Sequence, residues 1–256
     1  MPGSRPFNPD SDTRLQPAAE IRDLAFRWTE SGPPVLQLDH LRIERGERVF
    51  VAGPSGSGKT TLLNLLAGVA VPQQGSLRVL GRSLETVSGA QRDHFRADHI
   101  GYIFQMFNLI PYLSVLENVQ LPCHFSRVRR ARVRRRSGTP TAEALRLLSQ
   151  LDMAADGCPD RPVSTLSVGQ QQRVAAARAL MGAPELLIAD EPTSSLDADR
   201  RAAFIQLLFQ ECAGSGSTLV FVSHGTALAP LFDRTLSLAA LNRATSDRNT
   251  SAQSGS

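Results

Sequence analysis

One segment of this 256-residue sequence has the residue types and spacing of a phosphate-binding loop. It matches G-x-x-x-x-G-K-[ST] at every fixed position, through Gly53, Pro54, Ser55, Gly56, Ser57, Gly58, Lys59 and Thr60. Glycines let backbone amides curl around an anion, and the field of a following helix favours negative charge. The lysine can reach the outer phosphates of a nucleotide, and the threonine hydroxyl can ligate Mg²⁺. A plain glycine-rich turn is the alternative, but the strand and helix predicted on either side favour a nucleotide site.

Two adjacent carboxylates form a second candidate group. The apolar run 186–189 predicts a buried strand, and Asp190 and Glu191 follow it directly. Ligands of open α/β sheets bind at this carboxyl edge. Asp190 suits the Mg²⁺ shell through water, and Glu191 suits a general base that polarises an attacking water. The spacing alone does not decide which acid has which role, and two surface acids capping the next helix remain the alternative.

A third segment, Leu166-Ser167-Val168-Gly169-Gln170, leads straight into a predicted helix. A serine hydroxyl and a glycine amide at a helix N-terminus form an anion site. The chain therefore contains two phosphate-binding devices, far apart in sequence.

Hydrophobic periodicity predicts the elements that position these groups. Strands are expected at 21–28, 36–43, 48–52, 186–189 and 218–222, and helices at 60–66, 89–97, 115–122, 141–151, 171–181 and 200–211. The alternation in 36–43 slips by one residue near His40, which predicts a bulge or turn there. Strands alternating with helices predict a mostly parallel sheet covered on both faces.

Composition and charge limit the class of protein. Hydrophobic residues make up 41% and charged residues 20%, as in soluble globular proteins. No stretch reaches the ~18 apolar residues of a membrane span, and the N-terminal residues do not resemble a signal peptide. We therefore expect a cytoplasmic protein whose membrane contacts come through a partner. The three cysteines are widely spaced and are expected to be reduced.

Seven arginines lie between Ser126 and Arg136. A solvated, partly flexible segment is the simplest interpretation. Contact with anionic lipid headgroups is a second possibility, and nucleic-acid binding is a third. The lack of interleaved aromatic residues argues against single-strand binding.

The three motifs, followed by His224 at the end of a further strand, resemble the ATP-binding cassette (ABC) ATPase family over roughly residues 20–235. This resemblance implies an α/β P-loop NTPase fold with a mostly parallel core sheet, an antiparallel β-subdomain and an inserted α-helical subdomain. We expect the ATPase domain at 19–242, its helical subdomain at about 88–168, and tails at 1–18 and 243–256.

The resemblance also implies roles for single residues. Trp28 would stack on adenine, Gln105 would touch Mg²⁺ and the attacking water, and His224 would hold the γ-phosphate and that water. Thr61 would join the phosphate loop in binding ATP. In trans, the ATP held by a second copy of the chain would be bound by Ser167, Gly169, Gln170 and Asp197. Two positions depart from the family pattern: Val168 replaces a glycine and Gly225 replaces an aspartate.

Three stretches, 105–111, 113–119 and 170–174, resemble ATPases of lipoprotein release, macrolide export and cell division. That branch implies an ATP-hydrolysing homodimer coupled to an integral-membrane permease at the cytoplasmic face of the inner membrane, without nucleic acid. A non-transporting ATPase that regulates a membrane or periplasmic partner is the alternative. A soluble cassette acting on DNA or ribosomes fits less well, because the chain has one cassette and no long coiled coil.

Overall fold

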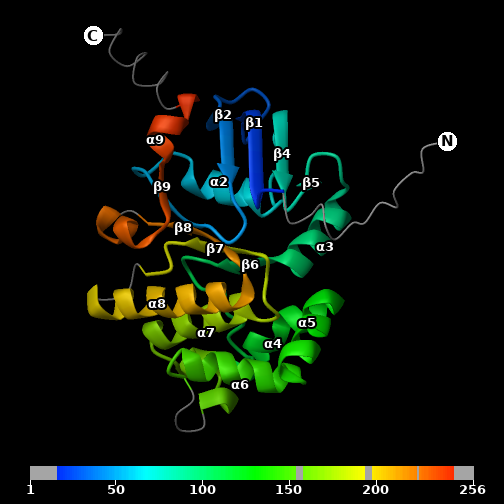
Figure 1. Ribbon diagram of the computed structural model, residues 1–256, viewed down its shortest axis with the longest axis vertical. Coiled ribbons are helices and arrows are strands. Elements are labelled where there is room, and N and C mark those ends of the chain that lie inside the picture. Colours follow the sequence, from blue (N-terminus) through cyan, green and yellow to red (C-terminus); the bar gives the residue numbers. More distant parts are fainter. Residues whose placement is uncertain (1–15, 154–157, 194–197, 224, 245–256) are drawn as a thin grey trace, which may run out of the picture.

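The computed structural model describes residues 16–153, 158–193, 198–223 and 225–244 (Figure 1). A parallel five-stranded sheet lies in the middle, in the order β6-β7-β8-β3-β9. Its strands are β3 (Arg48–Ala52), β6 (Ile100–Ile103), β7 (Leu186–Asp190), β8 (Thr218–Val222) and β9 (Arg234–Ser237). Every residue of β7 and β8 is buried, because helices and a second sheet cover both faces. The predicted α/β class with a mostly parallel sheet is confirmed.

The second sheet is antiparallel, in the order β2-β1-β4-β5. It comprises β1 (Ala19–Phe26), β2 (Leu36–Ile43), β4 (Gln74–Val79) and β5 (Arg82–Ser83). The predicted bulge at His40 is wrong, because β1 and β2 pair in one unbroken register. The irregularity lies in β1, where Asp23 has a φ of 48° and the register with β4 shifts between Arg22 and Ala25. The break in the hydrophobic alternation of β2 therefore lies opposite the irregular part of β1, with which β2 pairs.

The two faces of the parallel sheet belong to different hydrophobic cores. Ile188 and Val220 pack with the antiparallel sheet and with α2 (Lys59–Leu66). Leu187 and Phe221, one residue along, pack on the opposite face with the helices. The period-two alternation of side chains along a strand thus makes the parallel sheet the middle of three layers.

The helical layer is formed largely by an insertion between β6 and β7 (Figure 1). The helix α3 (Gly89–His99) precedes β6 and packs with the antiparallel sheet through Phe95. The helix α8 (Ala198–Ser215) follows β7 and packs in the helical layer through Phe204 and Leu208. The helices are α3 (Gly89–His99), α4 (Val115–Phe125), α5 (Arg127–Ser137), α6 (Pro140–Gln150), α7 (Val168–Leu180), α8 (Ala198–Ser215) and α9 (Leu238–Leu241). Within the described ranges, 3₁₀ turns lie at Cys158–Asp160, Val163–Thr165 and Thr226–Leu231. Serine capping boxes start α3, α4 and α7. The predicted starts at 89 and 115 are confirmed, whereas the start predicted at 171 is three residues late, because Ser167 caps α7 and the helix begins at Val168.

The arginine-rich segment differs from the expected flexible stretch, since it forms α5. Its sequence has almost no apolar periodicity, so the helix depends on tertiary contacts rather than on an amphipathic pattern. No helix of the described ranges is both long and apolar enough to cross a membrane. All three cysteines are buried free thiols, as expected.

Asn242, just after α9, joins the end of the described chain to the phosphate loop. Its amide Nδ2 donates to the Ser57 carbonyl (3.0 Å) and the Val35 carbonyl (2.9 Å), and its Oδ1 accepts from the Gln37 amide (2.8 Å). The side chain is fully buried, so water cannot replace these bonds. The C-terminal helix therefore supports the loop that the sequence marks for phosphate binding.

We expect Asn242→Ala to lower the free energy of unfolding by about 1–3 kcal/mol, because buried backbone groups lose their partners. Denaturant unfolding followed by circular dichroism measures the loss. Gln150→Ala, at the exposed end of α6, is the matched control and should unfold like the wild type. Equal stability of the two variants would remove Asn242 from its supporting role.

Candidate nucleotide site

The phosphate loop joins β3 to α2 and depends on glycine at two positions. Gly56 and Gly58 have φ values of 76° and 98°, which L side chains rarely adopt. A Cβ on Gly58 would also lie 3.0 Å from Leu36 Cδ1 and 3.4 Å from the Val35 carbonyl oxygen. The loop therefore has to carry glycine to curl above the start of the helix.

Lys59 is the first residue of α2 and the only lysine of the chain. It is buried, and its Nζ donates to the carbonyls of Gly53 (2.7 Å) and Pro54 (2.8 Å). Desolvation lowers the pKa of its ammonium, an effect that the nearby Glu191 and Asp190 oppose. A compact positive charge is thus held at the phosphate loop, close to the two carboxylates.

A cleft of about 310 Å³ brings distant predicted residues together. Ser55, Gly56, Gly58, Lys59, Thr60 and Thr61 line it from the loop and the start of α2, and Val35, Gln105 and Glu191 line it from elsewhere. Ser57 Oγ is buried beside the loop and has no hydrogen-bond partner among the described residues. An unsatisfied hydroxyl, loop amides and a buried ammonium suit a polyphosphate. Thr60, Gln105 and Asp190 offer the oxygen ligands that Mg²⁺ prefers.

The two carboxylates lie at the carboxyl edge of the central sheet, as predicted. Asp190 is the buried last residue of β7, paired with Val222 of β8. Glu191 has a φ of 48°, and its amide donates to the Val222 carbonyl (3.0 Å). Such strain in a non-glycine residue persists only where surrounding contacts hold it, and it is frequent at functional sites. The turn directs the chain so that Glu191, rather than Asp190, lines the cleft.

The loop that carries Gln105 is held by a residue that sequence reasoning missed. Arg178 of α7 donates to the Phe107 carbonyl (2.5 Å) and the Asn108 carbonyl (2.6 Å). Both loop residues have positive φ, at 59° and 50°. Burial lowers the pKa of Arg178 to about 10. No local signal distinguishes this arginine, because its partners lie about seventy residues earlier in the chain.

The Ser-Val-Gly-Gln turn starts α7 but contributes no residue to the cleft. Ser167 Oγ accepts from the Gln170 amide (3.3 Å), and Gln170 Oε1 accepts from the Ser167 amide (2.9 Å). Ser167 is exposed, Gly169 is half-buried, and Val168 is 54% exposed. The helix start is therefore pre-formed and faces outward, apart from the phosphate loop of its own chain.

Of three further predicted positions, the structure describes only Trp28. Trp28 is 58% exposed and packs edge-on against the buried Phe26, with ring centroids 4.9 Å apart. Phe26 is thus a core aromatic, and Trp28 presents a free ring face. His224 and Asp197 lie outside the described residues.

A phosphate loop at the carboxyl edge of a parallel sheet, faced by a strand-end acid pair, defines a P-loop nucleotide-hydrolase fold. Residues 36–194 match the family model described as ABC transporter. The chain belongs to this family, and it is an ATP-binding ATPase of the ABC type.

Individual relatives indicate the branch of the ABC family to which the chain belongs. The lipoprotein-releasing system ATP-binding protein LolD of Bacteroides fragilis is 37% identical, over 79% of this chain and 89% of that protein. The macrolide export ATP-binding/permease protein MacB of Rhodopirellula baltica is 38% identical, over 82% of this chain but 30% of that longer protein. The dimeric post-hydrolysis structure of the cassette MJ0796, bound to ADP and Pi, superimposes with a TM-score of 0.75 at 31% identity. It covers 88% of this chain and 95% of its own. The predicted lipoprotein-release and macrolide-export branch is confirmed.

We expect Lys59→Ala to weaken ATP binding at least about tenfold, because a charge-assisted contact to phosphate is lost. Lys59→Arg should also weaken it, since the larger planar guanidinium does not reproduce the two contacts that the compact ammonium makes with the Gly53 and Pro54 carbonyls. Isothermal titration calorimetry measures both affinities. Undiminished affinity of Lys59→Ala would contradict the phosphate-loop assignment.

Proposed function

We propose that two copies of this chain bind Mg²⁺-ATP between them and hydrolyse it to move a membrane permease. The observation that supports the site is the cleft that joins Lys59 and Thr60 to Gln105 and Glu191. Lys59 and the loop amides hold the β- and γ-phosphates. Trp28 stacks on adenine, for which its exposed ring face is suited.

In this proposal, hydrolysis depends on positioning of water opposite the γ-phosphate. Glu191 is the general base, and its strained turn directs it into the cleft. Gln105 and His224 orient the water and the γ-phosphate. Thr60, Gln105 and Asp190 would hold Mg²⁺, directly or through water, and the ion supplies neutralisation of phosphate charge.

The outward-facing turn at Ser167 supports a head-to-tail dimer. Since no residue of 166–170 reaches the cleft of its own chain, Ser167, Gly169 and Gln170 are available to ATP held by a second copy. Asp197 would join them in trans. The cassette MJ0796 has been solved as a dimer bound to ADP and Pi. A single chain would then bind ATP but hydrolyse it slowly.

An apolar groove supports a permease partner. It has a volume of about 540 Å³ and lies between α3, α4 and the loop after Gln105. Its wall includes Leu121, Pro122 and Phe125, and Phe125 is 76% exposed. Exposed apolar side chains of this size mark protein contacts, and the adjoining Gln105 loop would carry movement to the ATP site. We propose that a cytoplasmic helix of the permease docks here and holds the ATPase at the inner membrane.

We expect Glu191→Gln to keep ATP affinity, to reduce turnover by about 10²–10⁴-fold through loss of the base, and to accumulate an ATP-bound dimer. Phosphate-release assays and size-exclusion chromatography measure both effects. Adding Ser167→Arg to this variant should prevent the dimer without preventing ATP binding. Normal turnover in Glu191→Gln would exclude Glu191 as the base, and a dimer in the double variant would exclude the trans contact.

We expect Phe125→Ser to reduce recovery of the membrane partner when the ATPase is purified from detergent-solubilised membranes, because an apolar contact in the groove is lost. Quantitative mass spectrometry of the eluate measures the recovery. Val69→Ser, at another strongly exposed apolar side chain, is the matched control. Equal recovery with both variants would contradict docking in the groove, without affecting the ATPase assignment.

A further inference from the structure

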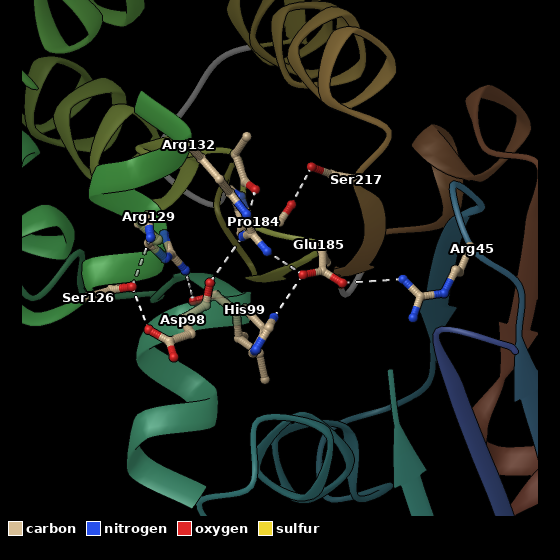
Figure 2. A network of polar contacts seen from close by, with 11 residues as sticks. Arg45, Asp98, His99, Ser126, Arg129, Arg132, Pro184, Glu185 and Ser217 are labelled. Carbon is tan, nitrogen blue, oxygen red and sulfur yellow. Dashed lines mark hydrogen bonds and ion pairs between the residues drawn. The ribbon is translucent and has the colours of Figure 1, made fainter. Parts of the chain in front are cut away.

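Two arginines of α5, Arg129 and Arg132, point toward the rest of the fold and bind it, as Figure 2 shows. Arg129 is 2% exposed and donates to the backbone carbonyls of Met181 (2.9 Å) and Ile100. Arg132 donates to the carbonyls of Asp98 (3.1 Å) and Ala183 (3.2 Å). Planar guanidinium forks suit such multiple contacts. These inward arginines hold α5 against the edge of the parallel sheet at which the strands begin.

Glu185 is the anionic centre of this junction (Figure 2). Arg132 pairs with it directly, His99 Nδ1 lies 2.7 Å from its Oε1, and Arg45 Nη1 lies 3.3 Å from its Oε2. The hydrogen bond from His99 is the main reason that the pKa of Glu185 falls to about 2. The carboxylate thus joins α5, the end of α3 and the β2–β3 turn, and it fixes which side of α5 faces outward.

The outward side carries a stripe of three arginines: Arg127, Arg134 and Arg135. They are exposed, and their side chains make no hydrogen bond or ion pair with any described residue. Spacings of seven and eight residues place them on one side of the helix, within about 12 Å along its axis. Three like charges so close repel one another, and no acidic side chain of the described residues forms an ion pair with them. Arg135 lines a pocket with Glu185, but that carboxylate pairs with Arg132 and Arg45 instead. Their arrangement is explained if an anionic surface outside the chain faces them.

The neighbourhood of the arginine stripe identifies the type of anionic surface. Phe125 and Val128, which are 76% and 37% exposed, lie beside Arg127 at the start of α5. Cationic side chains next to exposed apolar ones match a bilayer surface, where headgroup charge adjoins acyl chains. Cytoplasmic loops of membrane proteins are rich in lysine and arginine, so the permease segment proposed for the neighbouring groove would not neutralise the stripe. A single aromatic residue is a poor platform for single-stranded nucleic acid.

We propose that the arginine stripe of α5 contacts the anionic phospholipid headgroups of a membrane. Each arginine near such a surface strengthens binding about fivefold, so three contribute on the order of 100-fold. Binding of this strength is weak and reversible, and vesicles at high lipid concentration can detect it. It is enough to orient a subunit that is otherwise held at the membrane, and it does not depend on a permease.

Flotation of the full chain with lipid vesicles tests the proposal. One set contains phosphatidylcholine only, and the other contains about one third phosphatidylglycerol, a content at which polybasic contacts are effective. We expect the protein to bind the vesicles that contain phosphatidylglycerol and not those of phosphatidylcholine only. Raising the salt concentration to ~0.5 M should weaken this binding, because it screens the charges. The variant R127S/R134S/R135S should lose on the order of 100-fold in partition coefficient. The variant R127K/R134K/R135K keeps the charge and should still bind.

The control variant R22S/R42S/R78S removes the same formal charge from exposed positions of the antiparallel sheet. It should bind vesicles like the wild type, and ATP hydrolysis should be unchanged in every variant. If both serine variants lost vesicle binding equally, binding would depend on net charge and not on the position of the arginines, and the proposal would be overturned. Equal binding to neutral vesicles would overturn it too, as would displacement of the protein from anionic vesicles by a homopolymer RNA at the same charge concentration.

Discussion

A phosphate chain can be held inside a protein only where backbone amides and a positive charge reach it without side chains in between. The turn between β3 and α2 satisfies this constraint through Gly56 and Gly58, whose positive φ values curl the loop, and through the buried ammonium of Lys59. Other parts of the structure support this turn. Val35 contributes to the cleft, and Asn242 holds the Ser57 carbonyl from the far end of the described chain.

The strand order explains how distant residues meet at that loop. Because β6, β7, β8 and β3 are parallel neighbours, the segments that follow them emerge at one edge of the sheet. Gln105 follows β6, Glu191 follows β7 and the phosphate loop follows β3, so one cleft receives all three. Arg178 then fixes the Gln105 loop to α7, the helix that begins with the Ser167 turn. One rigid helix thus links the turn facing outward with the loop facing the cleft.

Lysine and arginine occupy different kinds of site in this chain because their charged groups differ in shape. Among the 28 strongly basic residues, lysine occurs once, at position 59. A compact ammonium fits between two loop carbonyls, whereas a guanidinium fork suits the spread carbonyls that Arg129 and Arg178 bind. Arginines that neither hold backbone nor pair with acids, as on the outer side of α5, contribute charge to the surface instead.

The sequence by itself determined the phosphate loop, the strand-end acids, the helix starts at 89 and 115 and the α/β class, because each rests on residues that are neighbours in the chain. Only the tertiary structure decided that the arginine run is a helix, that the strand bulge lies at Asp23, and that Arg178 and Asn242 support the site. The partners of those residues are separated by tens to hundreds of positions, and in α5 they are backbone carbonyls that any sequence supplies. Local patterns therefore identify the chemical groups, whereas the contacts that hold them appear only once the chain has folded.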